Sequence, residues 1–205
     1  MLSFKKKPMI RRIMALIKQR SEYFDGEKKI EGLISLRRYT YKDIKRMTDS
    51  FKEKLGQGGY GCVYKGKLQD GQLVVVKLLK KLKGDVGEFF KEVASICRTS
   101  NVNVGNLLGF CFEESKRALV YAFMPNGSLE KFIFNRSNTL ELDQLFTQDT
   151  LYQISLGIAH GLEYLHIGCN MWILHFDIKP HDILLDANYC PKIFDFGLAK
   201  ICPRE

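Results

Sequence analysis

The chain has 205 residues, of which 45% are hydrophobic and 27% are charged. This composition is typical of a globular protein and excludes a disordered or collagen-like chain. No stretch approaches the roughly 18 apolar residues that a membrane-spanning helix needs. Arg11 and Arg12 occupy the place where a signal peptide would have its apolar centre. We therefore expect neither a transmembrane segment nor a signal peptide in this chain.

The net charge of +9 is concentrated in the first 20 residues, which hold seven basic side chains and no acidic one. From Phe51 onward the charges almost cancel, with 18 basic against 17 acidic residues. A nucleic-acid-binding domain carries its basic excess on the folded body, so we expect no nucleic-acid partner. Residues 5–20 place apolar side chains at helical spacing among Lys and Arg. This arm is either a segment that lies on an anionic membrane surface or a solvated tail.

The hydrophobic pattern predicts a small, mostly antiparallel β lobe with one helix, followed by a helical lobe. Asp70-Gly71 is a hairpin turn signal within the β lobe. The predicted elements, in chain order, are a helix over 39–51, strands over 56–68 and 73–79, a helix over 88–98, strands over 107–112 and 118–123, helices over 129–134 and 151–165, and short strands over 173–176, 183–185 and 192–194.

The six cysteines include no C-x-x-C pair, and the two that lie closest in sequence are twelve residues apart. Zinc sites need clustered ligands, and the four histidines do not complete a set. We expect these side chains to be reduced thiols in a cytosolic compartment. They are Cys62, Cys97, Cys111, Cys169, Cys190 and Cys202.

The segment GQGGYGCV at 56–63 carries the pattern G-x-G-x-x-G, which suits a backbone that approaches phosphate oxygens closely. Three kinds of site use such a pattern. A dinucleotide-binding fold needs a helix at the third glycine, but the residues after Gly61 alternate like a strand. A P-loop needs Ser or Thr where Leu68 stands. The remaining kind is a loop between two strands that covers nucleotide phosphates, as in protein kinases.

Such a loop predicts a lysine on the next strand, and the run VVVK at 74–77 supplies Lys77. A lysine on a buried strand is unfavourable unless a carboxylate pairs with it. Glu92 on the following helix is the natural partner. Taken separately, Lys77 would be an edge-strand lysine and Glu92 a surface acid. Together with the glycine-rich segment, they predict a phosphate-binding site.

The second constellation is HFDIKPHDILL at 175–185, followed by DFG at 195–197. These runs resemble the catalytic loop H-R-D-x-K-x-x-N and the metal-binding turn D-F-G of the eukaryotic protein kinase family. The further runs LLGFCFE, LVYAFMPNGSL, GLEYLH and ILHFDIKP are similar to plant receptor-like Ser/Thr kinases, in particular the leaf-rust-resistance-kinase-like group. The resemblance extends from Tyr39 to Ile201.

The resemblance implies an α+β, protein-kinase-like bilobal fold with a complete β-rich small lobe and the first part of a helical large lobe. It divides the chain into a basic, juxtamembrane-like arm and linker over 1–38, a small lobe over 39–124 and a partial large lobe over 125–205. It also implies ATP and Mg²⁺ as cofactors, a protein as substrate, and a location on the cytosolic side of a membrane.

The resemblance assigns roles to individual residues. Asp177 would orient the substrate hydroxyl and accept its proton, and Lys179 would lie near the transferred phosphoryl group. Lys77, held by Glu92, would contact the α- and β-phosphates. The metal ligands would be Asp195 and Asp182. The nucleotide would contact Leu55, Gly56, Gly58, Gly61, Val63, Val75, Lys77, Tyr121, Ala122, Met124 and Leu184.

Three features depart from the family pattern. Asp182 stands where the family has Asn, which adds a negative charge near Asp195. Phe176 replaces an arginine that pairs with a phosphorylated activation loop, so we do not expect control by that switch. The chain also ends at Glu205, without the later A-P-E element. We expect nucleotide affinity with impaired phosphorylation of peptides; the alternatives are a catalytically silent ATP-binding or scaffolding module and a peripheral membrane adaptor.

Overall fold

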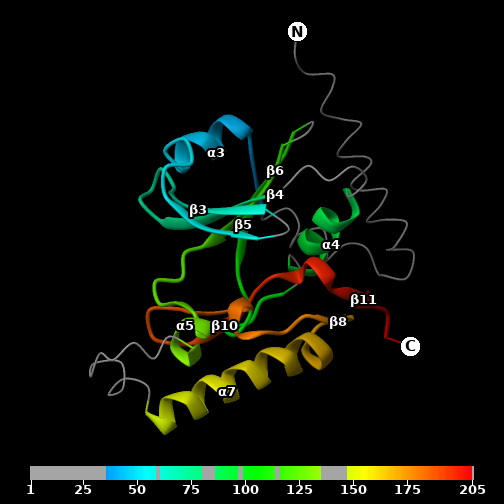
Figure 1. Ribbon diagram of the computed structural model, residues 1–205. Helices are drawn as coiled ribbons and strands as arrows, with labels where there is room; N and C mark the ends of the chain where they lie inside the picture. Colours follow the sequence, from blue (N-terminus) through cyan, green and yellow to red (C-terminus); the bar gives the residue numbers. More distant parts are fainter. Residues whose placement is uncertain are drawn as a thin grey trace. The chain divides into compact units, whose positions relative to one another are not determined.

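A computed structural model of the chain describes residues 36–58, 61–79, 86–96, 99–113, 116–134 and 147–204. The basic arm over 5–20, for which we expect membrane binding or solvation, lies outside these residues. The described residues belong to one compact unit that begins at Leu36. They combine β-sheet and helices (Figure 1), which confirms the α+β class.

A six-stranded sheet forms the first part of this unit, with the strand order β1-β5-β6-β4-β3-β2. All neighbours pair antiparallel except β1 and β5, which are parallel. The sheet is therefore mostly antiparallel, as predicted. The strands are β1 (Arg37–Tyr39), β2 (Lys54–Gly58), β3 (Gly61–Lys67), β4 (Leu73–Leu79), β5 (Leu107–Glu113) and β6 (Lys116–Ala122).

The hairpin between β3 and β4 turns at Asp70-Gly71, as the sequence predicted. Gly71 has a φ of 93°, which a residue with a side chain rarely adopts. The Gln72 N–H donates to Asp70 Oδ1 at 2.9 Å, an Asx-type bond that closes the turn. In contrast, the prediction of a linker through residue 38 is wrong at its end, because Arg37 and Arg38 form most of β1.

Alternation along β4 divides its side chains between the two faces of the sheet. Val74 and Val76 are fully buried on one face. Ile44 and Met47 of helix α3 (Tyr41–Met47) cover that face and belong to the same apolar cluster. Helix α3 begins at Thr40, whose hydroxyl accepts from the Asp43 N–H at 3.1 Å in a capping box. The predicted helix over 39–51 is thus confirmed, but it is shorter.

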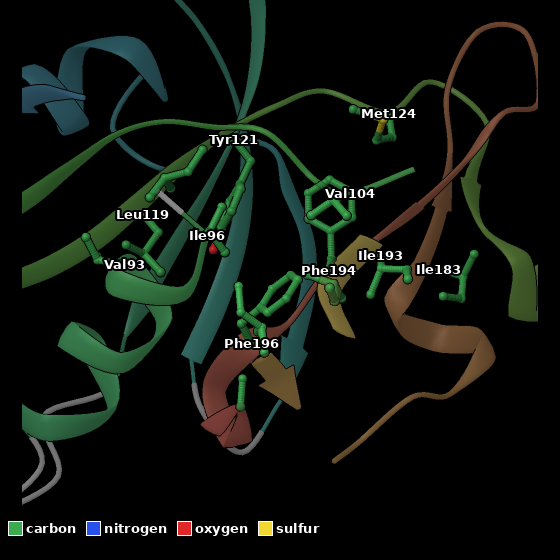
Figure 2. Packing of buried hydrophobic residues seen from close by; sticks show 14 of the residues in the cluster. Val93, Ile96, Val104, Leu119, Tyr121, Met124, Ile183, Ile193, Phe194 and Phe196 are labelled. Carbon is green, nitrogen blue, oxygen red and sulfur yellow. The ribbon is translucent and has the colours of Figure 1, made fainter. Parts of the chain in front are cut away.

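The opposite face of the sheet packs against helix α4 (Val86–Ile96) and the residues around 194–196. Figure 2 shows Val93 and Ile96 of α4 beside Leu119 and Tyr121, with Phe196 in the same cluster. This apolar cluster therefore joins the six-stranded sheet to the segment that contains the D-F-G run.

The second part of the unit consists of helix α7 (Gln148–Glu163) and short strands and turns, of which β10 and η1 contact the helix. Strands β10, β9 and β7 form a three-stranded sheet, and β11 pairs with β8. The elements are β7 (Gly127–Ser128), α5 (Leu129–Phe134), the π-helical turn η1 (Tyr164–Gly168), β8 (Trp172–Leu174), the 3-10 turn η2 (Pro180–Asp182), β9 (Ile183–Leu185), β10 (Pro191–Ile193), the 3-10 turn η3 (Phe196–Leu198) and β11 (Lys200–Cys202).

Helix α7 approaches β10 closely because two of its residues are glycines. A Cβ at Gly157 would lie 2.6 Å from the Pro191 side chain, and one at Gly161 would lie 2.9 Å from Ile193. The predicted apolar stripe of this helix is buried at Ile154, but Leu151 at its start is 42% exposed. The helical pattern also continues past Glu163 as the π-helical turn η1.

None of the described helices has both the length and the apolar character that a membrane span requires. The described cysteines are free thiols, namely Cys62, Cys111, Cys169, Cys190 and Cys202.

Gly61 and Gly56 give a matched test of the packing of the glycine-rich segment. A Cβ at Gly61 would lie 2.2 Å from the Leu78 carbonyl oxygen on β4, whereas one at Gly56 would meet nothing within 4 Å. We expect Gly61→Ala to lower the free energy of unfolding by about 1–3 kcal/mol, the usual cost of overpacking. Gly56→Ala should change it by less than about 0.5 kcal/mol. Denaturant unfolding measures both, and equal effects would contradict this packing.

Candidate active site

Lys77 lies at the centre of a group of buried charges that comes from three separate elements. Its Nζ is 3.0 Å from Glu92 Oε1 on α4 and 2.8 Å from Asp195 Oδ1, which precedes η3. The exposed fractions of the three side chains are only 15%, 4% and 25% in that order. The structure therefore brings together three residues that the sequence analysis placed in one site.

Electrostatic attraction keeps the Lys77 ammonium charged despite its burial. Burial on its own would lower the pKa of Lys77, but the Glu92 and Asp195 carboxylates raise it overall. Burial would likewise raise the pKa of Asp195, but the Lys77 ammonium outweighs that effect and lowers it. One cation thus faces two carboxylates, and this leaves a negative balance that a further cation can offset.

Tyr121 adds a hydrogen bond that the sequence analysis did not foresee. Its hydroxyl donates to Glu92 Oε1 at 2.7 Å, and its side chain is buried. Burial and the Glu92 charge raise the pKa of Tyr121 well above 10, so the phenol remains a donor. The strand pattern could have indicated this position. Leu119 pairs directly with Lys77 across β6 and β4, and Tyr121, two residues later, lies on the same face of the sheet.

The backbone around Asp195 is held from both sides. Asp195 has a left-handed φ of 61°, which is uncommon for a residue with a side chain. Before it, the Phe194 N–H donates to the Asp182 carbonyl at 2.9 Å, and the Phe194 carbonyl bonds to His175 Nε2 at 2.8 Å. After it, the Phe196 ring lies 4.9 Å from the His175 ring. The buried His175 therefore positions Asp195, a role that the sequence analysis missed.

Asp177, Lys179 and Asp182 form a second charged group. Lys179 Nζ donates to Asp177 Oδ2 at 2.8 Å and lies 3.4 Å from Asp182 Oδ2. The bond to Asp177 is the main reason that the pKa of Lys179 is raised. These three residues of the sequence motif therefore lie together, with Asp177 and Lys179 partly exposed.

Asp182 is buried without full hydrogen-bond satisfaction. Its exposed fraction is 5%, and Oδ2 has no hydrogen-bond partner among the described residues, because the Lys179 contact is an ion pair without hydrogen-bond geometry. Burial and repulsion from Asp195 raise the pKa of Asp182. Carboxylate oxygens suit Mg²⁺, which often takes one or two carboxylates and keeps several waters. Within the described ranges, no group of three or more His, Cys, Asp or Glu forms a larger metal site.

The residues assigned to nucleotide binding largely share one face of the six-stranded sheet. The register pairs Val63 with Lys77 and Val75 with Tyr121, and side chains that pair directly lie on the same face. Gly56 pairs with Val63, and Gly58 with Gly61, on β2 and β3. Residues 59 and 60 lie outside the described part of the chain.

Four assigned residues occupy other positions. Leu55 is 46% exposed and lies at a register shift in β2. Ala122 pairs with Val74, so register places it on the opposite face of β6. Met124 is buried in the cluster of Figure 2, and Leu184 on β9 packs against that cluster.

The bond from Tyr121 to Glu92 can be tested by Tyr121→Phe. This change keeps the ring but removes a buried bond to a carboxylate, so we expect the free energy of unfolding to fall by about 1.5–3 kcal/mol. Tyr39→Phe is the matched control, because Tyr39 is 7% exposed on the other face of the sheet. It should cost less than about 0.5 kcal/mol in the same denaturant experiment. Equal losses would argue against the bond.

The unfavourable charge of Asp182 can be tested by Asp182→Asn. Because the pKa of Asp182 is raised by folding, its ionised form destabilises the native state at neutral pH, and this penalty fades as pH falls below the native pKa toward 3.8. We expect Asp182→Asn to raise the free energy of unfolding by about 1 kcal/mol at pH 7. The gain should shrink toward pH 4. The stability difference between Asp182→Asn and the unaltered chain is measured at both pH values. A gain that is smaller at pH 7 than at pH 4 would contradict the destabilising charge.

Sequence comparisons identify proteins that are similar to this chain. The family described as "Protein tyrosine and serine/threonine kinase" matches residues 50–205. The chain is 54% identical over 179 residues to the leaf rust 10 disease-resistance locus receptor-like protein kinase-like 2.4 of Arabidopsis thaliana, with 86% of this chain and 28% of that protein covered. It is 54% identical over 168 residues to the rust resistance kinase Lr10 of Triticum aestivum, with 82% and 26% covered.

A third relative is the Arabidopsis thaliana protein SUPPRESSOR OF NPR1-1 CONSTITUTIVE 4, which is 52% identical over 179 residues, or 87% of this chain and 16% of that protein. The chain thus spans between 16% and 28% of the length of these relatives. The match to the family covers most of the chain and confirms the protein-kinase-like fold that the motifs predicted. The chain belongs to the protein kinase family and is similar to the plant receptor-like kinases within it.

Proposed function

We propose that this chain transfers the γ-phosphoryl group of ATP to Ser or Thr hydroxyls of a protein substrate, with Mg²⁺ as the metal. The observation that carries the proposal is the Lys77 ammonium, bonded to Glu92 at 3.0 Å and to Asp195 at 2.8 Å. Lys77 and Asp195 are 118 positions apart in the sequence. A buried cation held in this way is pre-positioned for phosphate oxygens.

The sheet face around Lys77 supports the placement of the nucleotide. Val63 and Val75 share that face, and we infer that they pack on one side of the adenine with Leu184 on the other. The backbone over Ala122–Met124 would bond to the adenine edge. The glycines of β2 would leave room for the phosphates, because Gly56 and Gly58 have open space where a Cβ would stand.

Asp195 and Asp182 would hold Mg²⁺ through their carboxylate oxygens. The metal would neutralise charge on the phosphates during transfer. The Asp182 oxygen without a hydrogen bond and the negative balance around Lys77 both suit a divalent cation. Lys77 would meanwhile keep Asp195 ionised and fix its orientation.

Asp177 would accept the proton of the substrate hydroxyl while the hydroxyl oxygen bonds to the γ-phosphorus and the β–γ bridging bond breaks. Lys179, which donates to Asp177 at 2.8 Å, would turn to the transferred phosphoryl group as its charge develops. Phosphoryl transfer depends mostly on positioning and charge neutralisation, so Asp177 and Lys179 would act together with Lys77 and the metal held by Asp195 and Asp182.

The division of the chain into an arm and linker over 1–38, a small lobe over 39–124 and a large-lobe part over 125–205 belongs to the same proposal. So do the membrane association of residues 5–20 and a location on the cytosolic side of a membrane. The relatives named above as receptor-like kinases support such a location.

A catalytically silent ATP-binding or scaffolding module is the second candidate. Asp182 favours it, since a buried carboxylate in place of the family's Asn adds repulsion beside Asp195. This candidate predicts that MgATP stabilises the chain while no phosphate is transferred.

Lys77→Met tests both candidates. Loss of the ammonium removes the partner of Glu92 and Asp195, so we expect at least a 100-fold loss of phosphate transfer, as is typical when one pre-positioned charge is removed. The rise in melting temperature on addition of MgATP should also largely disappear. Lys67→Met is the matched control, because Lys67 is exposed on the neighbouring strand β3. Transfer that survives in Lys77→Met contradicts the proposal, whereas stabilisation without any transfer in the unaltered chain selects the silent module.

A further inference from the structure

Phe176 has an unfavourable backbone conformation and an exposed aromatic side chain. It has a left-handed φ of 65°, and its side chain is 62% exposed. A bulky residue in this region of backbone space costs roughly 1–3 kcal/mol and persists only where its neighbours determine it. Phe176 lies between His175, which positions Asp195, and Asp177, the proposed proton acceptor. Such an outlier, placed between two residues of the site, points to a role for its side chain.

The partner of the Phe176 ring is Lys200. The Lys200 ammonium lies 5.2 Å from the centre of the ring, within the range of a cation–π interaction. In the part of the chain that the structure describes, Lys200 forms no ion pair, so the ring is the partner found for its charge. The contact joins the catalytic loop to β11.

The strand pairing explains how the two side chains meet. Lys200 pairs with Leu174 in the antiparallel pair of β11 and β8. Phe176 follows Leu174, the last residue of β8, by two positions, so the end of this strand pair brings it near Lys200. From this position the aromatic ring and the long lysine side chain meet at 5.2 Å.

The same two stretches of chain are joined at a second point. His175 packs against Phe196 in the interior, at 4.9 Å between ring centres. Phe176 meets Lys200 on the exposed side, at 5.2 Å. Two consecutive residues of the catalytic loop thus hold the segment that begins just after Asp195, one from inside and one from outside.

We propose that Phe176 and Lys200 are positioning residues which hold the segment 196–202 against the catalytic loop and so maintain Asp195 in its left-handed conformation without a phosphate group. The inference rests on the proposed function, because Asp195 is the metal ligand of that proposal. In the family pattern an arginine at position 176 would need a phosphorylated partner. Here the cation is on the later segment and the catalytic loop supplies the aromatic ring.

The pair can be tested by amide hydrogen exchange over residues 196–202 in the full 205-residue chain, after phosphatase treatment and without nucleotide. We expect Phe176→Ala and Lys200→Ala each to speed exchange about two- to five-fold, the range for an exposed cation–π contact. The double variant should exchange no faster than either single variant, because both changes remove one interaction. Phe176→Tyr and Lys200→Arg should preserve protection, and Lys42→Ala on α3 is the control for the loss of an exposed lysine.

A charge exchange gives an independent test. Phe176→Arg places a second cation beside Lys200 and should speed exchange, whereas Phe176→Arg combined with Lys200→Glu should restore protection. In phosphate-transfer assays, each alanine variant should lower kcat by the same two- to five-fold and change the KM for ATP by less than about twofold. A role in stability alone would leave kcat unchanged below the melting temperature.

Additive effects of the two alanine changes, or unchanged exchange rates in both variants, would overturn the proposal that Phe176 and Lys200 act as a pair. The result does not depend on catalysis, because hydrogen exchange needs neither nucleotide nor turnover. If the unaltered chain neither binds MgATP nor transfers phosphate, the proposed function fails, while the exchange data still decide whether Phe176 and Lys200 act together.

Discussion

A lysine that is largely removed from water between two carboxylates is the constraint on which the rest of this structure depends. The ammonium of Lys77 contacts Glu92 and Asp195, which come from a helix and from a turn late in the chain. A buried charge is tolerated only while its partners stay in place. The positions of β4, α4 and the segment around Asp195 are therefore mutually dependent, and Tyr121 strengthens this dependence through its bond to Glu92.

The alternation of side chains on β4 lets one strand serve both the core and the site. Val74 and Val76 are buried on the face that α3 covers, and Val75 and Lys77 lie on the other. A shift of the register by one residue would exchange the two sets and place the ammonium in an apolar layer. The direct pairing of Val63 with Lys77 and of Val75 with Tyr121 then brings the proposed nucleotide-binding residues to one face. The apolar cluster of Figure 2 continues from this face to Phe194 and Phe196, which flank Asp195.

Two residues have locally unfavourable arrangements, and both are next to residues of the proposed active site. Asp182 buries a carboxylate oxygen without a hydrogen bond, and Phe176 holds an exposed ring on a left-handed backbone. Proteins usually concentrate such violations at functional sites, where other interactions offset them. For Asp182 the offset would be a divalent cation; for Phe176 it is the Lys200 ammonium. Both residues also depart from the family pattern, and both lie in the surroundings of Asp195.

Features that depend on neighbours along the chain could be predicted from the order of the residues. The turn at Asp70-Gly71, the strand over 73–79 and the helix over 129–134 follow from residue type and periodicity, and the motifs around Lys77 and Asp195 identified the family. Only the folded structure shows that Arg37–Tyr39 and Lys200–Cys202 are strands, because three residues form a strand only when a partner strand is present. It likewise shows that Tyr121 bonds to Glu92, that His175 holds the Phe194 carbonyl, and that Lys200 meets Phe176. Each of these contacts joins residues at least 19 positions apart, and periodicity carries no information about distances across such separations.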